Sequence, residues 1–341
     1  MRKLMTIAVT GLALTMSAQA QFSYVTNNGT ITIIVGYTCP SGDVTIPDYI
    51  NGLPVTTIGN DAFLGCTTIT NLVIGNSVTL IGDGAFIFCT NLTGVTIPNG
   101  VAYIWRLAFA GCTRLTAVAI PKTVTLIGPE AFASCTRLSS VTIPNSVTSI
   151  LDGAFSSCGL TSVTIPDSIT SVSRSMFSGC RNLTNVTIPN SITSIGDNAF
   201  AECASLPGFP LANSLTSIGT NAFGGCNALT SVTIPDSVLS VGNYAFYQCG
   251  NLASVAIPNS VTSIGDGAFS SCGLISVTIP DSIASVSRSM FSGCTSLTNV
   301  TIPITVTCIG TNAFSGCTSL SGFKFPTALA PLEMGHSRLA A

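Results

Sequence analysis

Cysteine is the residue type in this chain whose spacing most invites a chemical explanation. The 341 residues include 14 cysteines, and twelve of these follow one another at intervals of 23 residues, or 22 in two cases. Each of the twelve is preceded three residues earlier by a phenylalanine. They are Cys66, Cys89, Cys112, Cys135, Cys158, Cys180, Cys203, Cys226, Cys249, Cys272, Cys294 and Cys317. Thiols repeated in this way could form disulfides, bind a metal ion or fill a hydrophobic core.

The phenylalanine partner favours burial of these thiols. If each interval is one turn of a coil, equivalent Cα atoms lie about 4.8 Å apart, but parallel side chains seldom reach the torsion that a disulfide needs. We therefore predict that the twelve cysteines are small apolar fillers with a weak S–H donor. Cys39 and Cys308 fall outside the series and are not expected to meet, and Cys308 is predicted to be a solvent-facing free thiol.

Other side chains offer little for catalysis. His336 is the chain's one histidine and lies near its end, so no Ser-His or Cys-His pair can form within the repeats. The thirteen acidic residues are spread singly, and the recurring places of Asp152, Asp197 and Asp266 suit turn hydrogen bonds. We predict no enzyme activity, no catalytic or metal-binding residues and no cofactor.

Internal repetition predicts the fold class. A period in this range is typical of a solenoid, in which each turn buries its apolar face against its neighbours. In one repeat, Val141 and Ile143 alternate with Ser140 and Thr142, as in a half-buried strand. A second short extended segment reaches Ile150, and Asp152 to Cys158 is expected to form a short helical or 3₁₀ piece.

The repeats also record a duplication. The sequence SVTIPDSITSVSRSMFSGC at 162–180 returns at 276–294 with one change, Thr170 to Ala284. A solenoid tolerates such copying because each turn contacts only its neighbours.

Composition and the N-terminus indicate export. Charged residues make up 7% of the chain and the formal net charge is −2, so no nucleic-acid partner is expected. Residues 1–20 are predicted to be a signal peptide, with Arg2 and Lys3 before an apolar stretch and Ala18-Gln19-Ala20 for cleavage. No later segment is predicted to span a membrane, and the protein is expected to be secreted or on the cell surface.

Three further segments follow the predicted leader. Residues 21–65 are expected to form an N-terminal cap hairpin, with Asn28-Gly29 as its turn, and a longer first repeat. Residues 66–323 form the repeat array. Residues 324–341 are a tail that is disordered or shortened, or else a partner covers that end.

The pattern LxxVxIPxSVTSIGDxAFxxC, written out as LTSVTIPDSVLSVGNYAFYQC at 229–249, resembles the BspA-type leucine-rich repeat of bacterial surface proteins and some parasitic protists. The resemblance implies a right-handed superhelix of about twelve units of 22–23 residues. One face would carry a parallel sheet, and the other short strands or 3₁₀ turns. For function it implies extracellular adhesion, often to host or neighbouring-cell proteins, and it supplies no catalytic residues.

The outer face of the predicted sheet is the remaining candidate for recognition. One threonine per repeat is expected to project from it, and the residues chosen as a ligand-binding surface are Thr164, Thr187, Thr233, Thr278 and Thr301. The leading hypothesis is an adhesion protein that binds an extracellular or neighbouring-cell protein. The alternatives are a glycan-binding protein, for which Tyr103 and Trp105 are the one clustered aromatic pair, and a purely structural surface protein.

Overall fold

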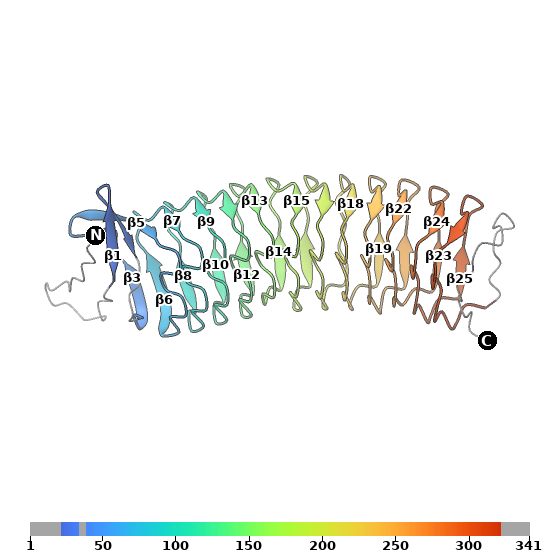
Figure 1. The fold of residues 1–341 in the computed structure, drawn as a ribbon, viewed down its shortest axis with the longest axis horizontal. Coiled ribbons are helices and arrows are strands. Elements are labelled where there is room, and N and C mark those ends of the chain that lie inside the picture. The colour runs from blue at the N-terminus through green and yellow to red at the C-terminus, as the bar shows by residue number, and fades with distance from the viewer. Residues whose placement is uncertain (1–21, 34–38, 322–341) are drawn as a thin grey trace. The chain divides into compact units, whose positions relative to one another are not determined.

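The computed structural model describes residues 22–33 and 39–321. The predicted signal peptide (1–20) and the whole predicted tail (324–341), with His336, therefore lie outside the described residues. The chain forms two compact units, Met1–Ser168 and Ile169–Ala341. In each unit, short strands follow one another along a coil, and no helix occurs in the part of the chain that the structure describes (Figure 1).

Unit 1 begins with an antiparallel hairpin. Strands β1 (Tyr24–Asn27) and β2 (Thr30–Ile33) are joined by Asn28 and Gly29, whose φ values of 48° and 78° are those of a tight hairpin turn. The hairpin expected at this end is therefore present. Strand β2 then pairs in parallel with β5 (Leu53–Ile58), so the hairpin lies against the first coil.

The remaining strands of unit 1 lie in two rows along the coil, called here the first and the second sheet, and the first row is divided into separately hydrogen-bonded groups. The first contains β3 (Gly42–Ile46), β6 (Ile69–Ile74) and β8 (Gly94–Thr96), while β10 (Ala117–Ala119) pairs with β12 (Ser140–Thr142); β14 (Ser162–Thr164) follows. The second sheet continues from β5 through β7 (Leu80–Ile81), β9 (Tyr103–Ile104), β11 (Leu126–Ile127) and β13 (Ser149–Ile150), with β4 (Tyr49–Ile50) as an antiparallel addition to β5.

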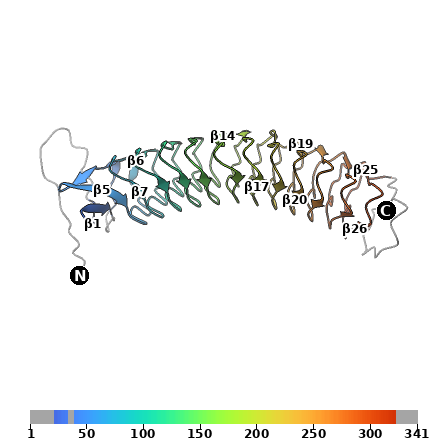
Figure 2. The ribbon, with the colours of Figure 1, turned by 90° about the horizontal axis from the view of Figure 1, so that it is seen from above.

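Unit 2 repeats this plan with shorter runs in its first sheet. That sheet contains β16 (Asn185–Thr187), the pair β19 (Ser231–Thr233) and β21 (Ser254–Ala256), and the pair β23 (Ser276–Thr278) and β25 (Asn299–Thr301). The second sheet contains β15 (Ser171–Val172), β17 (Ser194–Ile195), β18 (Ser217–Ile218), β20 (Ser240–Val241) and β22 (Ser263–Ile264), and then the pair β24 (Ser285–Val286) and β26 (Cys308–Ile309). Figure 2 shows β19 and β25 on one side of the coil, and β20 and β26 on the other.

The expected helical piece before each cysteine is instead a series of tight turns. Gly153 and Ser157 have positive φ values of 63° and 56°, which a right-handed helix does not allow. Half of the N–H groups bond within the turn, as from Ala154 to the carbonyl of Leu151 at 3.2 Å. The others bond to the next coil, as from Phe132 to Ala154 at 2.8 Å. This segment therefore forms a third ladder of backbone hydrogen bonds along the solenoid.

Phenylalanine rings form the centre of both units. In unit 1 the rings from Phe63 to Phe155 stack with centroids 4.9 to 5.5 Å apart, and in unit 2 those from Phe177 to Phe314 stack at 5.3 to 5.8 Å. Successive rings lie within 17° of parallel. The one-turn period of the sequence thus becomes a continuous aromatic core within each unit.

One coil of unit 2 interrupts the first sheet. Residues 208–210 form no strand, although they occupy the place that β16 and β19 occupy in the coils before and after. Pro207 and Pro210 have no N–H to donate, and Gly208 has a φ of 124°. Phe209 turns inward, with its ring 5.5 Å from that of Phe200. The second sheet continues past this coil through β18.

Candidate recognition surface

The five threonines predicted as a binding surface are exposed. Thr164 lies in β14 of unit 1, and the other four lie in β16, β19, β23 and β25 of unit 2, each as the last residue of its strand. The residue before each threonine is a valine that faces the interior. Thr278 and Thr301 are direct neighbours in the parallel register of β23 and β25, so their Cα atoms repeat at the spacing of adjacent strands, about 4.8 Å.

Hydrogen bonding separates these threonines from many others on the surface. Many exposed threonines donate their hydroxyl to a backbone carbonyl one coil earlier, as Thr216 does to Thr193 at 2.9 Å and Thr298 to Ile275 at 3.0 Å. Within 22–33 and 39–321, the hydroxyls of the five predicted threonines have no such partner. Their donors and acceptors are therefore free to bind another molecule.

A second exposed row runs beside the threonines, two residues earlier in each strand. In unit 2 it consists of Asn185, Ser231, Ser254, Ser276 and Asn299. Strands β16, β19, β21, β23 and β25 contain no charged residue. The outer face of the first sheet in unit 2 is therefore neutral and rich in hydroxyl and amide groups.

The threonine row is both longer and less regular than we expected from the sequence. Thr96 and Thr142 of unit 1 occupy the same strand position and are also exposed, so the 23-residue period alone could have identified them. In unit 2, Pro210 and Ala256 take this position in two coils and interrupt the row. Thr278 of β23 and Thr301 of β25 are therefore the longest uninterrupted stretch of the threonine row in unit 2.

The ladder thiols are buried, so they are poorly placed to react with a ligand. Cys89 donates from Sγ to the carbonyl of Phe63 at 3.2 Å, and burial raises the pKa of its thiol to about 12. The same S–H bond, to the phenylalanine of the preceding coil, recurs along each unit at 3.0 to 3.3 Å. The predicted role of the ladder thiols as buried fillers with a weak donor is confirmed for these residues.

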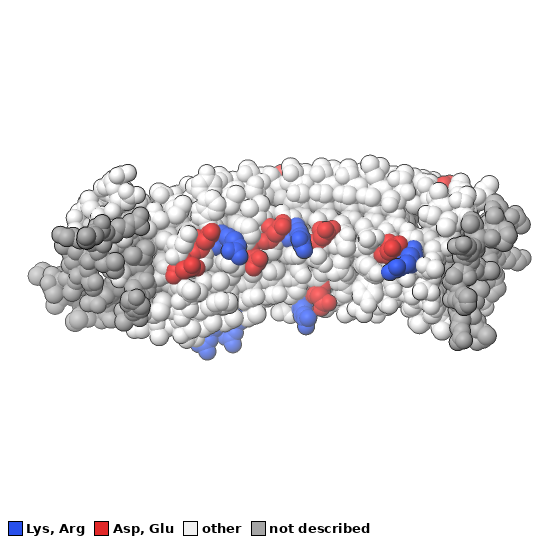
Figure 3. Space-filling view, in the orientation of Figure 1, with Lys and Arg blue, Asp and Glu red and all other residues white. Residues whose placement is uncertain are grey.

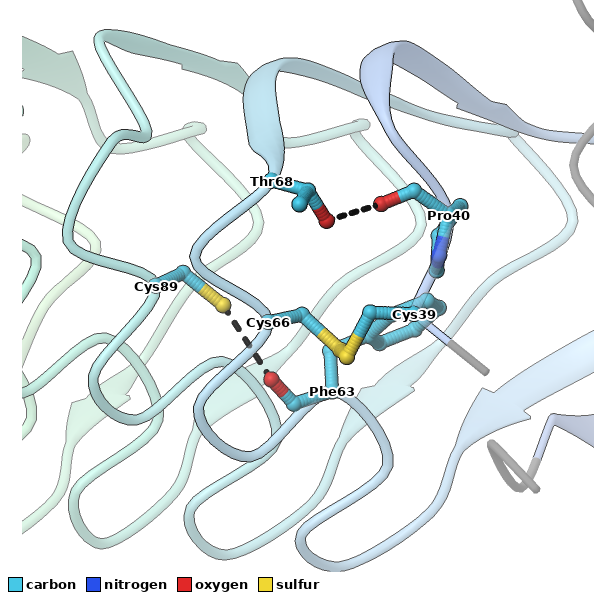
Figure 4. The surroundings of a disulfide bond; sticks show 6 residues. All are labelled: Cys39, Pro40, Phe63, Cys66, Thr68 and Cys89. Carbon is cyan, nitrogen blue, oxygen red and sulfur yellow. Dashed lines mark hydrogen bonds between the residues drawn. A yellow bond between two sulfur atoms is a disulfide. The ribbon is translucent and has the colours of Figure 1, made fainter. Parts of the chain in front are cut away.

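Cys66 is the exception, and here the prediction was wrong. It forms a disulfide with Cys39, with the two Cα atoms 5.3 Å apart (Figure 4). Beside this disulfide, Thr68 donates its hydroxyl to the carbonyl of Pro40 at 2.7 Å. Cys308, the other cysteine outside the series, is an exposed free thiol, as we expected.

Several acidic side chains accept hydrogen bonds from the next coil. Asp197 accepts a hydrogen bond from the backbone N–H of Thr220 at 2.7 Å, and Asp266 accepts one from the backbone N–H of Arg288 at 3.1 Å. Both bonds join a turn to the next coil, whereas we expected bonds within the turn. Hydrogen bonds from Asn71 and Thr70 lower the pKa of Asp43. Figure 3 shows few acidic and basic side chains on the visible face, most of which is uncharged.

The described ranges hold neither a cluster of metal ligands nor a membrane-spanning helix. No three histidine, cysteine, aspartate or glutamate side chains of residues 22–33 and 39–321 are grouped closely enough to hold a metal ion. Those same ranges contain no helix with the length and apolar character needed to cross a bilayer.

Comparison with known proteins assigns the family. The model for the BspA type leucine rich repeat region matches residues 56–184, 171–298 and 216–335. No curated protein sequence matches the chain.

Solved structures share the fold. A leucine-rich repeat protein from Bacteroides ovatus has 30% sequence identity and a TM-score of 0.69, over 90% of this chain and 93% of that one. A leucine-rich cell surface protein from Faecalibacterium prausnitzii has 28% identity and a TM-score of 0.59, over 92% and 94%. The pneumococcal vaccine antigen PcpA, at 19% identity and a TM-score of 0.57 over 86% and 93%, shares the fold alone. With its repeats, its parallel solenoid and these matches, the chain belongs to the BspA-type leucine-rich repeat family.

Proposed function

We propose that this protein is a secreted or cell-surface adhesion protein that binds an extracellular protein through the exposed face of its first sheet. The observation that carries the proposal is the row of threonines whose hydroxyls have no partner within the described residues, beside threonines whose hydroxyls bond to the backbone. The binding surface of unit 2 would comprise Thr187, Thr233, Thr278 and Thr301. Thr164 would contribute to the equivalent face of unit 1.

The side chains of this face suit the binding of a protein, and the proposed role involves no catalysis. Free hydroxyl and amide groups can bond to the backbone and polar side chains of a partner, and none of the five strands in unit 2 carries a charge. Binding would therefore depend weakly on ionic strength. The likeness to a protein described as a cell surface protein supports the proposed location.

The test compares two sets of alanine substitutions in the full chain. One variant carries Thr187→Ala, Thr233→Ala, Thr278→Ala and Thr301→Ala. The matched control carries the same change at four exposed threonines whose hydroxyls bond to backbone carbonyls, namely Thr193, Thr216, Thr262 and Thr307. Both variants and the unmodified protein are measured against a panel of purified extracellular proteins by surface plasmon resonance.

We expect at least one protein of the panel to bind the unmodified chain and the control variant with equal affinity. Affinity for the first variant should fall at least about tenfold, which four lost hydrogen bonds of ordinary strength would exceed. Retained affinity in that variant would contradict the role of the threonine face. Binding to no protein of the panel would favour the structural alternative.

A further inference from the structure

Two aromatic side chains lie together on the outer face of the second sheet in unit 1. Tyr103 is in β9 and Trp105 follows two residues later, so both point to the same side of the chain. Their exposed fractions are 42% and 39%, and their ring centroids are 5.7 Å apart with planes tilted by 46°. A second aromatic pair, Tyr244 and Tyr247 of unit 2, also has ring centroids 5.7 Å apart, so the prediction of a single clustered pair was wrong. The pair of unit 1 is the one that contains the tryptophan.

The neighbouring coils leave this pair open. The position of Trp105 is glycine in the coils before and after it, at Gly82 and Gly128, so the indole has no side chain beside it in that row. Ala102, just before Tyr103, replaces the threonine found at Thr79 and Thr125. Only small side chains therefore stand at these neighbouring positions, and a flat ligand could approach both rings.

Partly exposed leucines flank the pair along the sheet. Tyr103 is in register with Leu80 of β7 on one side and with Leu126 of β11 on the other, and both leucines are partly exposed. The next strand outward, β13, returns to serine at Ser149. In the second sheet of unit 2 the same position is serine in six strands, β15, β17, β18, β20, β22 and β24. The apolar group is thus confined to three adjacent strands of unit 1.

We propose that Tyr103 and Trp105 form a carbohydrate-binding site that takes one pyranose ring of a glycan. The C–H groups on one face of a pyranose are apolar and stack on aromatic rings, while its hydroxyls need hydrogen-bond partners at the edge. Arg106, the next residue, is exposed, and none of the described residues forms an ion pair with it. The proposal includes its five N–H donors as partners for hydroxyl oxygens of the sugar.

The size of the site favours a sugar over a protein. At about two-fifths exposure, the two rings present roughly 150–200 Å² together, whereas a stable protein interface buries about 800 Å² on each partner. The area fits one or two sugar rings. The site lies on a different face from the threonine row and does not depend on the proposed protein ligand.

The chain itself supplies the reporter, because Trp105 is its one tryptophan. Fluorescence emission of the full chain is followed during titration with tetrasaccharides of glucose (β1,4 and α1,4), mannose, galactose and N-acetylglucosamine. We expect at least one of them to shift the emission to shorter wavelength and to saturate. A dissociation constant between about 10 µM and 1 mM is expected, as for one small aromatic contact.

Substitutions copied from neighbouring coils test the site without disturbing the fold. Tyr103→Ser introduces the residue found at Ser149 and keeps the reporter, and Trp105→Gly introduces the residue found at Gly82. Phe88→Gly is the matched control, since Phe88 is also an exposed aromatic of unit 1 (55%) at a position that is glycine in the next coil. Affinity for the sugar should fall about tenfold in Tyr103→Ser and be unchanged in Phe88→Gly. Because Trp105→Gly removes the fluorescent reporter, its binding is measured by calorimetry, and no binding is expected.

Three results would overturn the proposal. The first is the absence of any emission change with all five sugars. The second is sugar binding that persists in Trp105→Gly, which would place the site elsewhere. The third is loss of a protein ligand, with no sugar binding, in the Tyr103 and Trp105 variants, which would make the pair part of a protein interface.

Discussion

The thiol of Cys294 donates a hydrogen bond to the backbone carbonyl of Phe269, 3.1 Å away in the preceding coil. The two residues belong to the side-chain ladders of unit 2, and the bond ties one coil to the next from inside the core. Burial raises the pKa of Cys294 to about 12, so this thiol stays protonated over the range in which an unfolded cysteine ionises.

This pKa shift predicts a loss of stability at alkaline pH. Unfolded thiols ionise near pH 8.5, so between about pH 9 and 12 the folded state holds more protons than the unfolded state. The free energy of unfolding should therefore fall as pH rises, by up to about 1.4 kcal/mol per pH unit for each such thiol. Urea denaturation in degassed buffer between pH 8 and 10.5 measures the slope. Cys294→Ala should show a shallower slope, and an identical slope would refute the assignment.

The phenylalanine stack predicts unequal costs for two aromatic substitutions. Phe200 is fully buried, with the rings of Phe177 and Phe223 each 5.5 Å away, so Phe200→Ala should lower the free energy of unfolding by about 3–5 kcal/mol. Tyr247 is partly exposed, and its replacement by alanine should cost less than about 1.5 kcal/mol. Chemical denaturation measures both, and equal losses would mean that Phe200 does not fill the core as described.

The Cys39–Cys66 disulfide should stabilise the start of unit 1. It closes a segment with a sequence separation of 27, for which loop entropy gives about 3–4 kcal/mol. In Cys39→Ser/Cys66→Ser, hydrogen exchange should accelerate in β1, β2 and β3 before it does in later strands. Cys308→Ser, which removes an exposed free thiol, serves as the control and should leave exchange unchanged. Unaltered protection of β1 to β3 in the double variant would argue against a stabilising role.

The two classes of exposed threonine should differ in stability as well as in binding. Thr216→Ala removes a hydroxyl that bonds to the carbonyl of Thr193 at 2.9 Å, and should cost about 0.5–1 kcal/mol. Thr233→Ala removes a hydroxyl with no partner in the described residues and should change stability by less than about 0.5 kcal/mol. Thermal denaturation of the two single variants measures the difference. A greater loss in Thr233→Ala would show that its hydroxyl has a structural role.

The fold was largely predictable because one period governs three properties at once. The 23-residue interval sets which residues face the core, which strands pair and where each phenylalanine stacks. The N-terminal hairpin was predictable for a separate, local reason, since Asn28 and Gly29 readily adopt positive φ. The conformation before each cysteine was not predictable. A run such as Asp152 to Phe155 is compatible with a helix, and only the hydrogen bonds to the next coil favour successive turns.

The disulfide was missed because an insertion hides the period at that point. Ile46 and Ile58 of the first coil are twelve residues apart, whereas their partners Ile74 and Ile81 are seven apart. The five extra residues form the antiparallel pair of β4 with β5. A register shift between Gly42 and Asp43 offsets one of these residues. Cys39 therefore lies 27 residues before Cys66 in the sequence, although in the fold it takes the place of a cysteine one coil earlier.

The candidate site was only partly predictable, for a different reason. Exposure of the threonines followed from strand alternation, but the absence of partners for their hydroxyls depends on the distance to backbone carbonyls of the coil before. The two classes also differ in their position, since Thr216 comes just before β18 and Thr233 is the last residue of β19. The interruption at Pro210 was visible in the sequence, as a departure from the IP motif, but its effect on the sheet needed the structure.

The coil that contains Pro207 and Pro210 has a consequence for how the chain finds its native state. Segments as similar as 162–180 and 276–294 could replace one another in a misfolded chain whose register is shifted by whole repeats. A segment without two of the required N–H donors cannot substitute for a regular neighbour, so misaligned arrangements would be left with mismatched hydrogen bonds. The irregular coil thus disfavours register-shifted arrangements of a nearly uniform chain and favours the native one.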